Sequence, residues 1–142
     1  MAYDIKTTSG EYEIDLHLRS NRTVISGDSG SGKTFLFNKL RRAKSTKNMV
    51  FIDYKYVRSE GNYDAVVDFI KHTTDTIFII DQADAIQRIS TDIMLAINLD
   101  SRNKFILMGR NPEIIYGFSD MCHVVIENNR ITLEYDFDEP LA

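Results

Sequence analysis

The sequence has a single cysteine, Cys122, which excludes an internal disulfide. No apolar run approaches the roughly 20 residues that a membrane-spanning helix needs. Residues 1–6 also lack the apolar core of a secretory signal peptide, so we expect a cytoplasmic chain without membrane insertion. No repeat or low-complexity linker divides the 142 residues, which predicts one domain over residues 1–142.

A large net charge is absent as well. The formal net charge of −4 argues against a broad nucleic-acid footprint. One short segment is nevertheless basic, with no acid between its charges, and we interpret it as the solvated end of a helix rather than a polyanion site. Nucleic-acid contact through this segment remains the alternative. Its members are Lys39, Arg41, Arg42, Lys44 and Lys47.

What the sequence does contain is a glycine-rich segment that fits the pattern G-x-x-x-x-G-K-[ST]. It follows an apolar, strand-like run at 23–25 and precedes a helix-like run at 35–42. Glycines allow the main-chain N–H groups to curl around a phosphate, and the positive end of the helix favours the anion. A flexible Gly/Ser turn is the alternative interpretation. The candidate phosphate-binding residues are Gly27, Asp28, Ser29, Gly30, Ser31, Gly32, Lys33 and Thr34.

The same pattern assigns roles to individual side chains. Lys33 is expected to reach the β- and γ-phosphates of a nucleotide, and the Thr34 hydroxyl to bind Mg²⁺. The apolar run at 76–80 is typical of a buried parallel strand, and it ends in a carboxylate, Asp81. We expect Asp81 to lie beside the phosphate loop and to hold the metal through water.

The order of the elements predicts an α/β fold of three layers. Predicted strands at 48–53, 76–81, 104–108 and 124–126 alternate with helical regions at 64–71 and 83–99. This alternation indicates a mainly parallel, five-stranded sheet. Antiparallel N-terminal strands, at 3–7 and 12–18, and a C-terminal hairpin with its turn at Asn128 and Asn129 complete the fold. Cys122 begins a buried strand, and adjacent Cys122 and His123 point to opposite faces, which argues against a shared metal.

On these motifs the chain resembles the P-loop NTPases. One strand separates the phosphate-loop strand from the Asp81 strand, and in this it is similar to the branch that contains the ABC and AAA+ ATPases. The resemblance to a stripped ABC-type ATPase core spans nearly the whole chain and implies the strand order fifth, first, fourth, third, second. The guanine-reading N-K-x-D is missing at 38–41 and 103–106, which favours adenine.

Three departures from that pattern bear on catalysis. Gln82 stands where the resemblance implies a glutamate that polarises the attacking water, and an amide cannot accept the proton. Asp84 is the alternative acid. Arg110 aligns with a switch or sensor position and is a candidate γ-phosphate contact, although it could instead pair with Glu113 or Asp120. Residues 54–75 are too few for the ABC helical subdomain, and L-S-G-G-Q is absent.

We therefore expect a chain that binds Mg²⁺-ATP and hydrolyses it slowly or with the help of a protein partner, as a regulatory or accessory ATPase. Gln82, Asp84 and Arg110 are the catalytic candidates. Two alternatives remain, a switch or adaptor that does not hydrolyse ATP and a small-molecule phosphotransferase. The second is disfavoured because residues 83–102 hold only Arg88 and Arg102, whereas such enzymes carry an arginine-rich lid. Lys55 and Arg58 are further candidates for nucleotide contact, or for a solvated loop.

Overall fold

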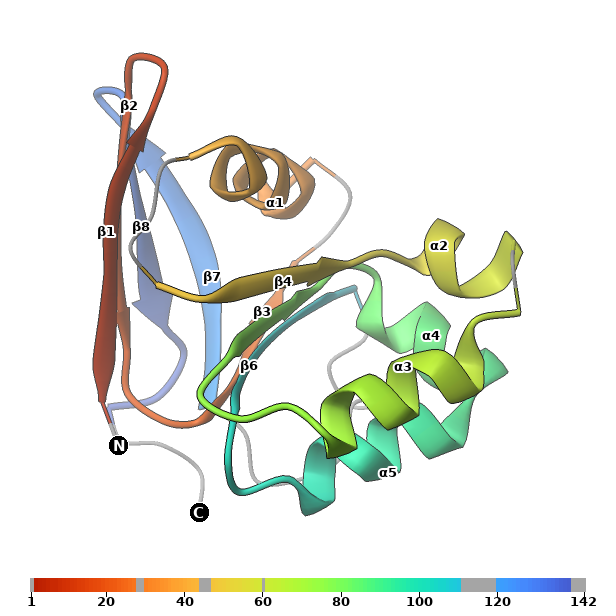
Figure 1. Ribbon diagram of the computed structural model, residues 1–142. Coiled ribbons are helices and arrows are strands. Elements are labelled where there is room, and N and C mark those ends of the chain that lie inside the picture. The colour runs from red at the N-terminus through yellow and green to blue at the C-terminus, as the bar shows by residue number, and fades with distance from the viewer. Residues whose placement is uncertain (1, 28–29, 44–46, 60, 111–119, 139–142) are drawn as a thin grey trace.

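The computed structural model describes residues 2–27, 30–43, 47–59, 61–110 and 120–138. Its strands form one eight-stranded sheet in the order β1-β2-β8-β7-β3-β6-β5-β4 (Figure 1). The strands are β1 (Tyr3–Ser9), β2 (Tyr12–Leu18), β3 (Arg22–Ser26), β4 (Met49–Ile52), β5 (Ile77–Ile80), β6 (Lys104–Gly109), β7 (Asp120–Glu127) and β8 (Arg130–Tyr135). The helices are α1 (Lys33–Arg42), α2 (Tyr54–Ser59), α3 (Tyr63–Lys71), α4 (Ala83–Ile89) and α5 (Thr91–Leu99).

The sheet is mixed and larger than predicted. Five neighbouring strands, β7, β3, β6, β5 and β4, pair in parallel and keep the predicted relative order. Strands β1 and β2 form the predicted antiparallel pair, and β7 and β8 the predicted hairpin. Both pairs belong to the same sheet as the five parallel strands, however, because β2 also pairs in parallel with β8 through Glu13–Arg130 and Ile14–Ile131. The five-stranded sheet of the prediction is thus corrected to one continuous mixed sheet.

Helices cover both faces of the sheet, which gives the three layers. Helix α1 packs on one face, next to the curled part formed by β1, β2 and β8, and α3, α4 and α5 pack on the other (Figure 1). Strand β5 shows why both faces are covered: Ile77 and Ile79 enter the core on the α1 side, whereas Phe78 and Ile80 enter the core on the other side. A strand that buries both faces needs such a continuous apolar run.

Two details of the helical layer differ from the prediction. Helix α2 follows β4 directly, where a loop was expected, and the Asp53 carboxylate caps it by accepting the Tyr56 N–H at 2.7 Å. The helical region at 83–99 is two helices, because Ser90 adopts an extended conformation between α4 and α5. The predicted hairpin turn is confirmed, since Asn128 and Asn129 both have positive φ, as a two-residue hairpin turn requires.

Candidate functional site

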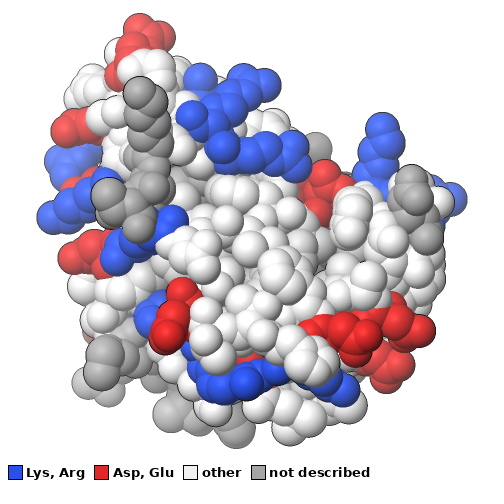
Figure 2. Space-filling model, in the orientation of Figure 1, with Lys and Arg blue, Asp and Glu red and all other residues white. Residues whose placement is uncertain are grey.

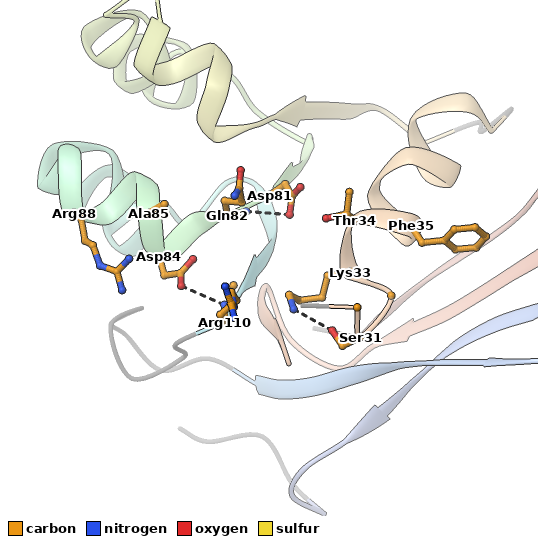
Figure 3. Close-up of a pocket in the computed structure, with 13 residues that line it drawn as sticks. Ser31, Lys33, Thr34, Phe35, Asp81, Gln82, Asp84, Ala85, Arg88 and Arg110 are labelled. Carbon is orange, nitrogen blue, oxygen red and sulfur yellow. Dashed lines mark hydrogen bonds between the residues drawn. The ribbon is translucent and has the colours of Figure 1, made fainter. Parts of the chain in front are cut away.

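A cavity of about 650 Å³ opens where β3, β5 and β6 end and where α1 and α4 begin (Figure 3). The carboxyl ends of parallel strands are the usual place for a ligand in a sheet of this kind. Most of the residues that line it are polar or glycine: Gly30, Ser31, Gly32, Lys33, Thr34, Phe35, Asp81, Gln82, Asp84, Ala85, Arg88, Gly109 and Arg110.

The glycine-rich segment adopts a conformation that side chains would obstruct. Gly27, Gly30 and Gly32 have φ of 141°, 87° and 98°, all in the region that favours glycine. A Cβ on Gly27 would lie 2.7 Å from Ser31 Oγ, a distance that packed atoms do not tolerate. Gly32 is the N-cap of α1, so the helix starts at Lys33. Asp28 and Ser29, also named as phosphate-binding candidates, lie outside the described residues.

Lys33 folds back over its own loop. Its side chain is buried, and its ammonium group donates to the main-chain oxygen of Gly27 and, at 3.0 Å, to Ser31 Oγ. The ammonium group therefore already lies inside the loop. Phosphate oxygens could take the place of the Gly27 and Ser31 oxygens as acceptors of its hydrogen bonds. A charged donor held at the helix start is suited to an anion.

Asp81 and Thr34 face each other across the cavity (Figure 3). Asp81 is buried at the end of β5, and this burial raises the pKa of its carboxyl group; the neighbouring Asp53 carboxylate raises it further. Lys33, the Thr34 hydroxyl and the N–H of Gln82, which donates to Asp81 Oδ1 at 3.0 Å, all act to lower that pKa. A carboxylate and a hydroxyl are oxygen ligands of the kind that Mg²⁺ takes.

The catalytic candidates occupy different surroundings. Gln82 is exposed and has the left-handed conformation φ 53°, ψ 44°, which costs a residue with a Cβ about 1 kcal/mol. Asp84 is buried, and its Oδ2 accepts the main-chain N–H of Arg110 at 3.2 Å, so it joins α4 to the end of β6. The cavity brings Gln82, Asp84 and Arg110 together with the phosphate loop.

Asp120 and Glu113 are the two acids that the sequence offers as ion-pair partners of Arg110. Asp120 does not pair with it, because the Asp120 carboxylate is held by Arg19 at 2.6 Å. Glu113 lies outside the described residues. The exposed side chain of Arg110 lines the cavity instead.

Sequence reasoning gave no site role to Arg88, which the cavity includes. Arg88 lies four residues after Asp84 on α4, so helical periodicity places the two on one face. Lys55 and Arg58, in contrast, are not among the lining residues: Lys55 borders a separate hollow with Asp53, and the Arg58 guanidinium lies over the Tyr54 ring.

Some side chains of the basic segment at the end of α1 already contact other residues of the domain. Figure 2 shows Lys and Arg atoms gathered over α1. Lys39 lies over the rings of Tyr12 and Phe35, and Arg41 forms an ion pair with Asp53 at 3.5 Å. Lys44 lies outside the described residues. Lys39 and Arg41 therefore already have partners, which favours the interpretation as a helix end.

Within the described ranges, no cluster of three or more His, Cys, Asp or Glu side chains could hold a metal ion. None of the helices in that part of the chain is long and apolar enough to cross a membrane.

The comparisons with known proteins place the chain in a family. No curated protein matches it. The family model of the KAP family P-loop domain matches residues 19–121, more than two thirds of the chain, from the residue after β2 to the start of β7. The match supports a P-loop NTPase, but it does not support the ABC/AAA+ branch in particular. The chain therefore belongs to the KAP family of P-loop domains.

Proposed function

We propose that this domain binds Mg²⁺-ATP in the cavity between α1 and α4. The observation that carries the proposal is the meeting of three groups in one cavity: Lys33 and Thr34 at the start of α1, and Asp81 at the end of β5. Lys33 would neutralise the β- and γ-phosphates, while Thr34 and Asp81 would hold the metal. A bound Mg²⁺ would neutralise charge that develops on the phosphates.

Two observations support adenine as the base of the bound nucleotide: the missing guanine-reading motif and the position of Asn103. A guanine-reading motif at 103–106 would need this side chain at the nucleotide. Asn103 instead bonds to Thr73, Asp100 and Thr76 at the start of β6, the strand end opposite to the cavity. Its role there is to hold neighbouring turns together.

Hydrolysis, in this proposal, is slow or depends on a protein partner. The reaction is attack of water on the γ-phosphate, and the residue that follows Asp81 is Gln82, whose amide orients water without accepting its proton. Asp84, the other acid among the residues that line the cavity, already accepts a hydrogen bond from the main chain of Arg110. We propose a regulatory or accessory ATPase, and a switch that does not hydrolyse ATP is the second candidate because of Gln82.

A calorimetric titration with a non-hydrolysable ATP analogue and Mg²⁺ tests the proposal. Lys33→Ala should weaken binding at least tenfold, because a charged hydrogen-bond donor to phosphate is lost. Lys39→Ala, on the same helix but over the Tyr12 ring, is the control and should bind like the wild type. Equal affinity of wild type and Lys33→Ala would refute the assignment.

The metal site is tested in the same assay. Thr34→Val and Asp81→Asn should bind the analogue in EDTA as the wild type does, and should lose most of the gain in affinity that Mg²⁺ brings. If both variants keep the full Mg²⁺ effect, the metal ligands are assigned wrongly. The release of phosphate from ATP, with and without candidate acceptor molecules, separates ATPase, switch and phosphotransferase.

A further inference from the structure

Arg88 is a cation on the wall of the cavity that faces the phosphate loop. It lies in the last turn of α4, its side chain is exposed, and it lines the cavity with Lys33 and Arg110 (Figure 3). Its guanidinium forms no hydrogen bond or ion pair with the part of the chain that the structure describes. A planar group with five N–H donors at this position is suited to a phosphate oxygen pair.

Its backbone is held firmly although its side chain is exposed. Ala83, Ile86 and Gln87 bury the opposite face of α4 in the core, and Asp84 ties the helix to the main chain of Arg110. Asp84 and Arg88 are one turn apart and share the face that borders the cavity. Sites built on helices hold their side chains in place more precisely than sites built on loops.

The charges in the cavity are unevenly distributed. Asp81 lies beside Thr34, on the side of the cavity where the metal is proposed to bind. The Asp84 carboxylate already accepts a hydrogen bond from the main-chain N–H of Arg110. Arg88 and Arg110 therefore add positive charge on the α4 and β6 side, across from Lys33. A triphosphate carries one more charged group than a diphosphate, and that group would meet these cations.

We propose that Arg88 is a γ-phosphate ligand that makes the cavity select nucleoside triphosphate over diphosphate. This inference rests on the proposed nucleotide binding, and it identifies a residue that reads the state of the nucleotide. The simpler explanation is that Arg88 only complements the helix dipole at the end of α4. Arg42 serves as the matched control for that explanation, since it is an exposed arginine in the last turn of α1 and does not line the cavity.

The test is a set of calorimetric titrations with Mg²⁺, using ADP and a non-hydrolysable ATP analogue on wild type, Arg88→Ala, Arg88→Lys and Arg42→Ala. Arg88→Ala should lose about 10- to 100-fold in affinity for the ATP analogue, as expected for a hydrogen bond to a charged group, and less than about twofold for ADP. Arg88→Lys should recover part of the loss, because it keeps the charge without the planar fork. Arg42→Ala should bind both nucleotides like the wild type.

The outcomes are distinct. Equal losses for ADP and the ATP analogue, or no loss for either, would overturn the role of Arg88 while leaving nucleotide binding intact. A wild type that binds neither nucleotide would overturn the proposed function, and this inference with it. Thermal unfolding of each variant shows whether the fold is kept.

Discussion

Arg19 and Asp120, 101 residues apart in the sequence, form a two-pronged ion pair in which Nε and Nη2 donate to the two carboxylate oxygens at 2.8 and 2.6 Å. The Asp120 side chain is fully buried. The same guanidinium donates to the main-chain oxygens of Phe137 and Asp138 and lies over the Tyr135 ring. Arg19 thus joins the segment between β2 and β3 to the start of β7 and to the residues after β8.

We predict that Arg19→Met lowers the free energy of unfolding by about 3–5 kcal/mol, since it leaves a buried carboxylate without its partner. Urea unfolding followed by circular dichroism measures the change. The control is Arg130→Met, which removes the ion pair of Arg130 with Asp15, whose side chains are 54% and 31% exposed. An exposed pair contributes about 1 kcal/mol or less. Similar losses in the two variants would contradict the distinction.

Gly27→Ala should abolish nucleotide binding with a smaller effect on folding. Its φ of 141° is strained for a residue with a Cβ, and the new atom would meet Ser31 Oγ at 2.7 Å inside the phosphate loop. Gly10→Ala, in the β1–β2 turn, is the matched control, because φ is also positive there but no atom lies within 4 Å of the added Cβ. Calorimetry and thermal unfolding report binding and folding separately. If Gly27→Ala binds ATP normally, the loop does not need its present shape.

Gln82→Glu should raise the single-turnover rate of ATP hydrolysis. General-base assistance is typically worth about 10²–10⁴-fold, and the exposed side chain at position 82 can accept the change without burying a charge. Asp84→Asn should have little effect in the Gln82→Glu background, since asparagine retains an oxygen that accepts the Arg110 N–H.

The opposite result identifies a different acid. If Gln82→Glu is inert and Asp84→Asn abolishes turnover, Asp84 activates the water. If neither substitution changes the rate with Mg²⁺ and ATP saturating, the nucleotide orders a partner-binding surface, and the switch is the better description.

Cys122 should resist thiol reagents in the native protein. The thiol is fully buried, and burial, together with the nearby Asp120 and Asp136 carboxylates, raises its pKa well above the usual value. Because the thiolate is the reactive form, labelling should stay slow even at pH 9 and should accelerate with urea in step with unfolding. Rapid labelling without denaturant would show that β7 opens locally. Urea-unfolded protein provides the reference rate.

The local parts of the site could be predicted from the sequence because short-range geometry determines them. The order of strand, glycine-rich loop and helix at 23–42 is found in β3 and α1, and the carboxylate after the apolar run at 76–80 lies in the same cavity as Lys33. Strand and helix periodicities indicated the elements themselves, whereas the resemblance to the P-loop NTPases implied the order that the five parallel strands keep. The elements, unlike their order, depend mainly on residues that are near in the sequence.

The rest depends on contacts between distant residues. Nothing in the sequence of β2 indicates that it pairs in parallel with β8. Asp120 was an alternative partner for Arg110 on the basis of the sequence, whereas in the fold Asp120 pairs with Arg19. Helix α2 was missed because Asp53 was assigned to a strand, while in the structure it caps the helix. Arg88 became a site residue only when α4 was placed beside the cavity.

The position of β3 in the middle of the sheet has a consequence for synthesis on the ribosome. Residues 22–26 pair with residues 105–109 and 120–122, so both neighbours of the strand that carries the phosphate loop are made long after it. Chains emerge N-terminus first, and pairing between distant segments is slow. We expect ribosome-bound chains that end before residue 105 to bind no nucleotide, and the ability to bind it to appear abruptly once β6 and β7 have emerged. ATP would then bind only the completed domain and would not assist the folding of the incomplete chain.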